Sequence, residues 1–587
     1  MDKRTQTSPI LLRWSQHVPA SDVQDPLGLG LRGSARLASR LLYCVTSITP
    51  RARYFSFLPW CVYNYQQCEK GKQFALGLWD AIVLREQALT LACIAHHEGD
   101  PCKGGALVGS RDARTWVSKS PSKANFGKLR PFAKNPALSA YLNSLVNLGF
   151  FETEKERPDT DEETSSEEFT FDDIKLSPLG LDLAKRYDLE VGRLATTKQL
   201  SLKHRTCTLA ELADFGRHGG LCELSRKGSA DRDLLRDIFF TLVDTQGESH
   251  PVRRRSLLLV LELCRQFSAA DWHLDEPHFS GAVYYGAVVN DESRTDIAIP
   301  PQLRDIATRW RMFYFHQYMS VALEGIFSWL VSQLHPYGLA GATIGSLVAQ
   351  LDETSLRKVL SDLLQINLEG SFGDLSPSVL FAAAGVRGDD LDTDLSKVLD
   401  EKIGSWTPFS EDRLEDTIRG NEHLYDSIGL AMPMILLATT LARYTQWEAT
   451  NYGKWLASTA DDPYLDLIPP LLTAGLTRRF GNWWKCSWKE LTTFVMSRYV
   501  VQQHQSMSYE KTWTGERCLL QIDGQKLVST GNYDRIGMGN PRLRSAIQII
   551  KDLGLMEDDE DGASRLTPEG RQFLKRELDR ESENEVS

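Results

Sequence analysis

Cations alternate with aromatic rings in one stretch of the C-terminal part of the chain. The stretch reads Arg478-Arg479-Phe480-Gly481-Asn482-Trp483-Trp484-Lys485 and continues with Trp488-Lys489. Guanidinium and ammonium groups bind phosphates, while exposed indole rings stack on unpaired bases. The predicted nucleic-acid-binding residues of this stretch are Arg478, Arg479, Lys485 and Trp483. In an alternative interpretation, Trp484 and Trp488 fill one face of a helix and the lysines lie beside it.

A second candidate lies near the N-terminus, where aromatic residues are dense. It reads Arg51-Ala52-Arg53-Tyr54-Phe55-Ser56-Phe57-Leu58-Pro59-Trp60. Arg51 and Arg53 could meet phosphates while the neighbouring rings stack on bases. The density of aromatic residues favours a different interpretation, in which the rings form a core and the two arginines form surface ion pairs.

Metal-ligating residues occur, but their spacing predicts no metal site. Cys207, His218 and Cys222, with His204 nearby, are possible zinc ligands, yet their spacing matches no familiar finger. His96-His97-Glu98 lacks the HExxH spacing and is interpreted as the surface end of a helix. We accordingly expect no metal and no cofactor.

Catalytic motifs are equally weak. Asp523-Gly524-Gln525-Lys526 offers one acid and one lysine, whereas a metal-dependent nuclease needs clustered carboxylates. Asp523-Gly524 is better explained as the two-residue turn of a hairpin whose strands are Cys518–Ile522 and Gln525–Val528. No nucleophile elbow, phosphate-binding loop, dinucleotide fingerprint or kinase motif occurs. The sequence therefore favours a protein without catalytic activity.

One segment of the chain occurs twice. Both copies contain an Asn-Pro pair, an apolar stripe at helical spacing, a glycine and a Ser/Thr-Pro pair. The first has Asn135-Pro136, Leu138, Leu142, Leu145, Gly149 and Ser177-Pro178, and the second has Asn540-Pro541, Leu543, Ile547, Ile550, Gly554 and Thr567-Pro568. Asn at the N-cap followed by Pro starts a helix, and a left-handed glycine ends it. Each copy therefore predicts a helix, a two-stranded hairpin and a second helix.

This order of elements resembles the end of a winged helix-turn-helix domain. The resemblance implies that Leu138–Leu148 and Leu543–Leu553 are recognition helices. The second copy carries Arg542, Arg544 and Lys551, whereas the first has no basic residue between Leu138 and Leu148. We expect only the second module to touch DNA. In the alternative interpretation, both modules are structural or dock a partner protein.

The charge of the chain is distributed unevenly. The net charge is −11, but the first predicted hairpin (Glu152–Glu168) carries −7, the second (Glu557–Asp561) −5 and the tail (Glu577–Ser587) −4, so the remainder carries +5. The hairpins should repel phosphates, whereas the body of the protein is compatible with DNA. Total charge therefore does not exclude a nucleic-acid partner.

The location of the protein is expected to be cytoplasmic. Ten cysteines without a CxxC pair and a polar N-terminus indicate reduced thiols and no secretory signal. The apolar stretches Phe313–Leu334 and Ile428–Ala442 contain polar residues or proline, so we expect core helices rather than membrane spans.

The expected fold class is mainly α with small β elements (α+β), in a multidomain chain. Two winged-helix modules are expected to flank a helical middle region. The predicted segments are an α-rich N-terminal domain with the aromatic stretch (1–120), the first module (121–190), the helical middle (191–490), and a β-hairpin with the second module and acidic tail (491–587).

The stretch Arg51–Trp60 resembles a motif of uncharacterised bacterial proteins encoded in phage-defence islands, and the module at Asn540–Leu543 is similar to their C-terminal ends. The resemblance carries no catalytic residues. It implies a non-catalytic DNA-binding or adaptor subunit of an anti-phage complex, whose other subunits include an ATPase or a nuclease. The alternative is a metal-dependent nuclease, or another nucleic-acid-processing enzyme, with an unrecognised site in 191–490.

Overall fold

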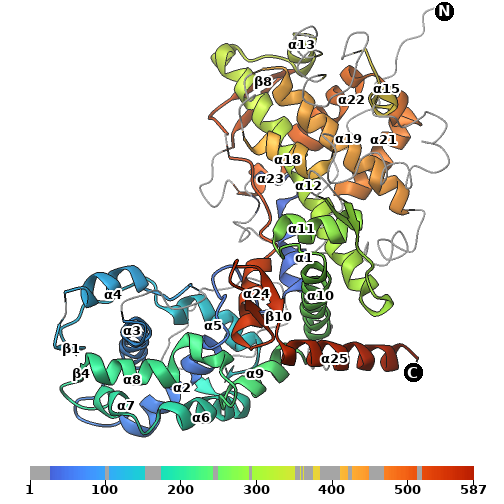
Figure 1. Cartoon of the computed structure of the whole chain (residues 1–587). Helices are drawn as coiled ribbons and strands as arrows, with labels where there is room; N and C mark the ends of the chain where they lie inside the picture. Colours follow the sequence, from blue (N-terminus) through green and yellow to red (C-terminus); the bar gives the residue numbers. More distant parts are fainter. Residues whose placement is uncertain are drawn as a thin grey trace, which may run out of the picture. The chain divides into compact units, whose positions relative to one another are not determined.

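The computed structural model confirms a mainly α-helical fold with small β elements (Figure 1). It describes residues 25–586 except 26, 99–104, 120, 153–173, 242–248, 290–293, 351–373 (apart from 357 and 361), 384–409, 421–425, 449–467, 512–517 and 534. Among the described residues, five two-stranded sheets pair β1 with β4, β2 with β3, β5 with β6, β7 with β8, and β9 with β10. The strands are antiparallel in the β1–β4, β2–β3, β7–β8 and β9–β10 pairs. Most of the first predicted hairpin (Glu152–Glu168) lies outside the described residues.

The chain divides into two compact units. The first unit comprises Met1–Leu37, Val289–Arg294 and Arg311–Gly539, and the second comprises Ala38–Val288, Thr295–Trp310 and Asn540–Ser587. Both copies of the repeated segment therefore belong to the second unit. Four of the five boundaries between the units fall inside α1 (Leu31–Leu41), β5 (Ala287–Val289), β6 (Arg294–Asp296) and α12 (Arg304–Leu334), and the fifth lies between Gly539 and Asn540.

The core of the first unit contains two long apolar helices, α12 and α19 (Ile428–Glu448). The two helices approach closely at Gly325 of α12, where an added Cβ would lie only 2.7 Å from Cγ of Pro433 in α19. The described part of this unit also contains α13 (Ile344–Ala349), α15 (Pro377–Ala383), α18 (Glu411–Arg419), α21 (Ile468–Phe480), α22 (Trp488–Val495), α23 (Gln502–Lys511), β7 (Leu520–Asp523) and β8 (Lys526–Ser529). No helix among the described residues is sufficiently long and apolar to span a membrane.

The β7–β8 hairpin forms as predicted, but its turn is shifted by one residue. Asp523 pairs with Lys526, so the two turn residues are Gly524 and Gln525. Gly524 adopts a φ of 62°, and a glycine at the first central position is typical of a two-residue hairpin turn.

The second unit is a helical assembly with three of the small sheets wholly within it. It contains α2 (Tyr54–Cys68), α3 (Leu78–His96), α4 (Ser110–Val117), β1 (Lys123–Asn125), α5 (Ala137–Asn147), β2 (Phe151–Glu152), β3 (Lys175–Leu176), α6 (Pro178–Val191), α7 (Ala195–Leu200), β4 (Thr206–Thr208), α8 (Leu209–Gly219), α9 (Arg232–Phe239), α10 (Ser249–Ala269), α11 (Glu276–Ser280), α24 (Leu543–Asp552), β9 (Met556–Asp558), β10 (Ser564–Leu566) and α25 (Pro568–Val586). A capping box starts α8, in which Thr208 and Glu211 exchange hydrogen bonds.

The repeated segment forms the predicted helix, hairpin and helix in both copies, namely α5-β2-β3-α6 and α24-β9-β10-α25. The helices α5 and α24 end at Gly149 and Gly554, each with a φ of 74°. The hydroxyl groups of Ser177 and Thr567 then accept from the backbone N–H groups of Gly180 and Gly570, each at 2.9 Å. The same capping chemistry therefore recurs at matching positions.

The starts of the first helices differ from the prediction. Pro136 occupies the N-cap position of α5, and Arg542, in a left-handed conformation, occupies that of α24. In α5 the orphan N–H groups of Ala137 and Leu138 donate to the Glu86 carboxylate of α3, at 2.7 and 2.9 Å. A buried acid from another helix thus replaces the expected Asn cap.

Burial raises the pKa of Glu86 from 4.5 to about 7, although the two N–H donors lower it. Because the folded pKa exceeds the unfolded one, the contribution of Glu86 to stability is complete below about pH 4.5 and is lost as pH rises through 7. We predict that the unfolding free energy of the wild type, relative to Glu86→Gln, falls by on the order of 2 to 3 kcal/mol between pH 4.5 and 8.

Urea denaturation of both proteins across this pH range measures the difference. Glu324 and His316, whose pKa values burial moves to about 7 and about 4, also titrate in or near this window. Both remain in the variant, so their contributions cancel. A pH-independent difference between the two proteins would contradict the prediction.

Candidate nucleic-acid interface

Arg51 and Arg53 are not available to phosphates, because both side chains are fully buried. The aromatic residues around them form a core, as the alternative interpretation predicted. Phe55 contacts Tyr141 of α5 and Phe239 of α9, with ring centroids 5.1 and 5.3 Å apart. The expectation of surface ion pairs is wrong, since the ion pairs of both arginines lie within this core.

Arg51 connects the first helices of the two modules. Its Nε donates to Oδ2 of Asp552 on α24 at 2.9 Å, and its backbone N–H donates to the Tyr141 hydroxyl of α5 at 3.0 Å. The backbone N–H of Ala52 donates to the same Asp552 oxygen at 3.0 Å. Burial raises the pKa of Asp552, while Arg51 lowers it. The side chain of Arg51 thus stabilises the second unit instead of forming an open site.

Arg53 is held by a second acid. Its guanidinium lies 3.4 Å from Oδ2 of Asp231 and donates to the Gly220 carbonyl at 2.8 Å. Asp231 also accepts from the hydroxyl groups of Ser56 at 2.5 Å and Ser229 at 2.8 Å. Burial alone lowers the pKa of Arg53, but Asp231 holds it above its ordinary value. The cation therefore remains charged inside the core.

The Arg478–Lys489 stretch is divided between exposed and buried residues. Arg478, Arg479 and Lys485 are exposed, whereas Trp483 is 2% exposed and cannot stack on a base. Trp484 is half-buried, and its ring meets that of Trp483 edge to face at a centroid distance of 5.8 Å. Three cations, Arg478, Arg479 and Lys485, are therefore exposed together with part of one indole, whereas Lys489 is paired with Asp374.

The predicted continuous helix through Trp484 and Trp488 is also wrong. Residues Trp483–Lys485 form a 3-10 turn, and α22 begins at Trp488 behind a new N-cap, Ser487. The Ser487 hydroxyl and the Glu490 carboxylate form a capping box, which starts a separate helix. The signal was present in the sequence as Ser-x-x-Glu.

In the second module, most of the predicted recognition helix is buried. On α24 the exposed or half-buried residues are Arg544, Gln548 and Lys551, which lie on one face. Lys551 forms an ion pair with Asp558 of the acidic hairpin. Arg542 is occupied as well, since its guanidinium donates to the Ser39 hydroxyl at 2.7 Å and to the Val45 carbonyl at 3.0 Å. Of the three predicted cations, Arg544 is exposed, whereas Arg542 and Lys551 are half-buried.

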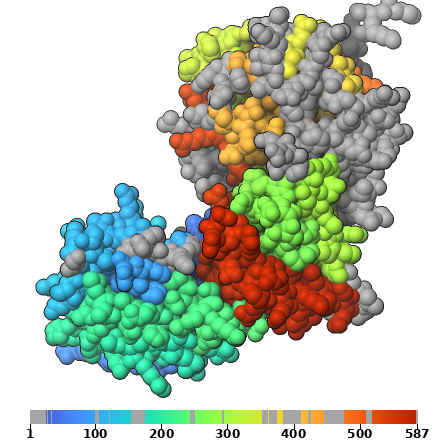
Figure 2. Space-filling model, in the orientation of Figure 1, coloured from blue at the N-terminus to red at the C-terminus, as the bar shows by residue number. Residues whose placement is uncertain are grey.

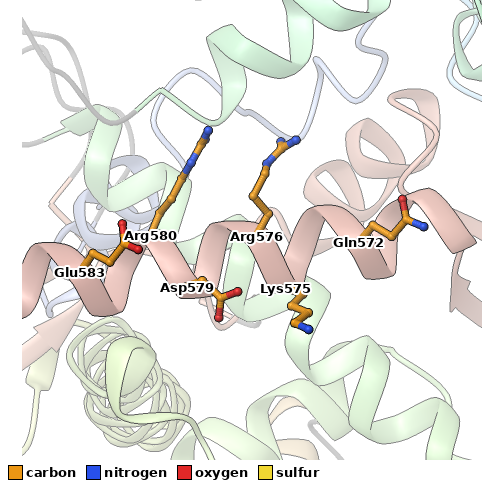
Figure 3. Close-up of a pocket in the computed structure, with 6 residues that line it drawn as sticks. All are labelled: Gln572, Lys575, Arg576, Asp579, Arg580 and Glu583. Atoms are coloured by element: carbon orange, nitrogen blue, oxygen red, sulfur yellow. The ribbon is translucent and has the colours of Figure 1, made fainter.

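The exposed face of α25 is a further polar surface (Figure 3). The helix α25 belongs to the C-terminal segment that is coloured red in Figure 2. It is lined by Gln572, Lys575, Arg576, Asp579, Arg580 and Glu583. Arg576 and Arg580 are paired with Glu577, at 3.0 and 2.9 Å, and Glu577 also binds Arg254 of α10 at 2.9 Å. The pair between Arg254 and Glu577 links α10 to α25, and the Glu577 carboxylate offsets part of the positive charge of Arg576 and Arg580.

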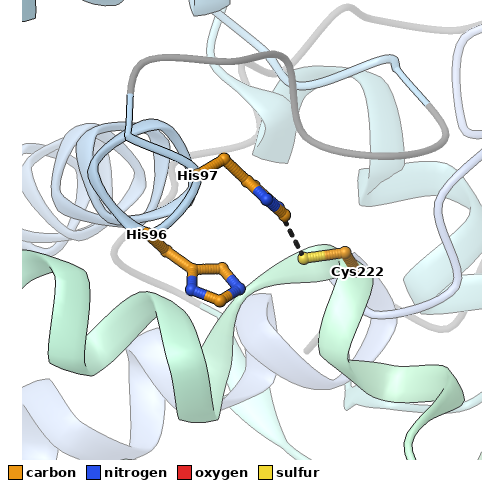
Figure 4. A group of neighbouring side chains, drawn as sticks. All are labelled: His96, His97 and Cys222. Atoms are coloured by element: carbon orange, nitrogen blue, oxygen red, sulfur yellow. Dashed lines mark hydrogen bonds between the residues drawn. The ribbon is translucent and has the colours of Figure 1, made fainter.

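The possible metal ligands combine differently in the structure from the two groups considered in the sequence. Cys207 is buried in β4, where burial raises its pKa to about 12, and Nδ1 of His218 donates to the Asp214 carbonyl at 2.9 Å. Among the described residues, the group able to hold a metal instead combines His96, His97 and Cys222 (Figure 4). No spacing rule indicated this combination, because the residues come from segments far apart in the sequence.

Comparisons with known proteins give no match. No family model, no curated protein and no solved structure is significantly similar to this chain.

Proposed function

We propose that this protein is a cytoplasmic, non-catalytic subunit of a bacterial anti-phage complex that binds single-stranded nucleic acid. The observation that carries the binding proposal is the exposed group formed by Arg478, Arg479, Lys485 and the half-buried Trp484. We call this group the α21 cationic patch. The defence role rests on the resemblance of the Arg51–Trp60 stretch to proteins of phage-defence islands.

The local structure explains why these cations are presented to solvent. Arg478 and Arg479 lie in the last turn of α21, and Gly481, with a φ of 69°, ends the helix. Among the described residues, no carboxylate forms a close ion pair with either arginine, although Arg479 lowers the pKa of Glu490 electrostatically and lies 5.9 Å from the centroid of the Phe480 ring. The guanidinium groups can therefore exchange solvent and counterions for phosphates, and Trp484 supplies a ring for one unpaired base.

We predict that Arg478→Glu/Arg479→Glu weakens binding to a single-stranded oligonucleotide by at least about tenfold at low salt and reduces the salt slope, because two phosphate contacts are lost. Trp484→Ala should weaken binding by roughly 1 to 3 kcal/mol through lost stacking. Fluorescence anisotropy with single-stranded and duplex oligonucleotides across a salt series measures both effects.

The matched control is Lys198→Glu/Lys203→Glu, which makes the same change in net charge at exposed positions outside the α21 cationic patch. This control should retain most of the wild-type affinity. The binding proposal fails if the wild type binds neither oligonucleotide at low salt, or if both double variants lose equal affinity.

A partner-docking function is favoured by a different observation. In the β9–β10 hairpin, Glu557, Glu560 and Asp561 are exposed, while Lys551 and Arg565 are paired with Asp558 and Asp559. This negative surface repels phosphates and attracts a basic protein surface. Mass spectrometry of proteins that co-purify from the native operon, with and without Glu557→Lys/Glu560→Lys, tests whether such a partner is held there.

A further inference from the structure

Two histidines and a cysteine converge at one end of α3 in the second unit (Figure 4). His96 is the last residue of α3, His97 follows it as the C-cap, and Cys222 belongs to the short 3-10 helix Leu221–Ser225. Their ligand atoms all lie within 4.8 Å of one another. The distance between His97 Nε2 and Cys222 Sγ is 3.2 Å.

The packing of α3 against α8 brings these residues together. Gly216 of α8 sits so close to α3 that an added Cβ would lie 2.3 Å from the Ala92 carbonyl oxygen and 2.7 Å from Cβ of His96. The helix α8 ends at Gly219, and the chain then turns directly into the segment that carries Cys222. The convergence is therefore built by the helix packing and not by a surface loop.

We propose that His96, His97 and Cys222 bind a zinc ion. A tetrahedral zinc ion, with Zn–N bonds of about 2.0 to 2.1 Å and a Zn–S bond of about 2.3 Å, separates its ligand atoms by roughly 3.3 to 3.6 Å. The 3.2 Å between His97 and Cys222 is close to this separation. Two imidazoles and a thiolate are donors that prefer zinc to magnesium or calcium.

A carboxylate supports the site. Glu223 Oε1 lies 3.0 Å from His96 Nε2 and 3.9 Å from Cys222 Sγ. A carboxylate bonded to a ligating histidine fixes the orientation of its ring and raises its basicity, so Glu223 is a positioning residue. All three ligands are half-buried, which leaves a path for the ion and a fourth coordination position for water. The ion would link the end of α3 to the 3-10 helix after α8.

The proposal is tested on the full-length protein with zinc and with cobalt as a spectroscopic probe. We expect one zinc ion per chain by elemental analysis and competition with a chromogenic chelator. The cobalt form should show a thiolate-to-metal charge-transfer band. Cys222→Ser should abolish this band, and His97→Asn should weaken zinc binding by at least tenfold. Glu223→Gln should weaken it by about ten- to a hundredfold, as expected for loss of a supporting carboxylate.

The matched controls are Cys68→Ser, a half-buried thiol on α2, and His218→Asn on α8, both in the same unit. Both should bind zinc as the wild type does, and circular dichroism establishes that each variant is folded. The proposal is overturned if the wild type binds no stoichiometric zinc, or if the folded Cys222→Ser protein retains the charge-transfer band. Equal loss in the cysteine variants at positions 68 and 222 would also overturn it.

Discussion

Asp231→Ala is expected to destabilise the second unit by about 3 to 5 kcal/mol. The substitution removes the acid partner of Arg53 and leaves a charge that is fully buried, with the Gly220 carbonyl as an acceptor. Breaking a buried pair by removing one member costs this amount because the remaining charge stays desolvated. Ser56 and Ser229 would lose their acceptor at the same time. Urea denaturation followed by tryptophan fluorescence measures the change.

Asp233→Ala provides the matched control, because Asp233 lies in the first turn of α9 and Asp231 is the N-cap residue of the same helix. The Asp233 side chain is 73% exposed and lies 3.5 Å from Arg232, so its removal should cost less than about 1 kcal/mol. The double variant Arg53→Met/Asp231→Leu replaces both charges by apolar groups and should recover much of the lost stability. Equal stabilities of the Asp231 and Asp233 variants would contradict the assigned role of this ion pair.

The repeated module was predictable because its determinants are local. Ser177 and Thr567 cap helices through the next residues in the chain, and Gly149 and Gly554 end helices through their own backbone conformation. Such features act over a few residues, and the hydrophobic periodicity before them fixes the buried face. The order of helix, hairpin and helix therefore followed from the sequence.

The roles of the chemically active residues depended on partners far away in the chain. Arg51 meets Asp552 across 501 positions, and nothing near Arg51 distinguishes a buried ion pair from an exposed cation. The same holds for His97 and Cys222, which are separated by 125 positions. In the Arg478–Lys489 stretch the error was local, because the aromatic spacing of Trp484 and Trp488 concealed the cap at Ser487. Periodicity and a capping signal conflicted, and the capping signal decided the structure.

Gly180→Ala and Gly570→Ala are expected to destabilise their modules by about 3 kcal/mol or more each. An added Cβ would lie 2.1 Å from the Phe150 carbonyl oxygen in the first module and 2.0 Å from the Leu555 carbonyl oxygen in the second. These are backbone atoms, and each also accepts a hydrogen bond from the backbone N–H of the N-cap residue, Ser177 or Thr567, so neither can move away without breaking that bond. Overpacking against an immobile backbone costs more than the usual 1 to 3 kcal/mol of a crowded core.

The sign of this effect separates the structural explanation from helix propensity. Propensity alone predicts that Gly→Ala inside a helix stabilises by up to about 1 kcal/mol. Gly345 in α13 is the matched control, because an added Cβ there meets nothing within 4 Å. Thermal or urea denaturation should therefore show a neutral or stabilising effect for Gly345→Ala and large losses for the two module variants. If Gly180→Ala and Gly570→Ala instead behaved like Gly345→Ala, the close contact between each hairpin and its following helix would be refuted in both copies.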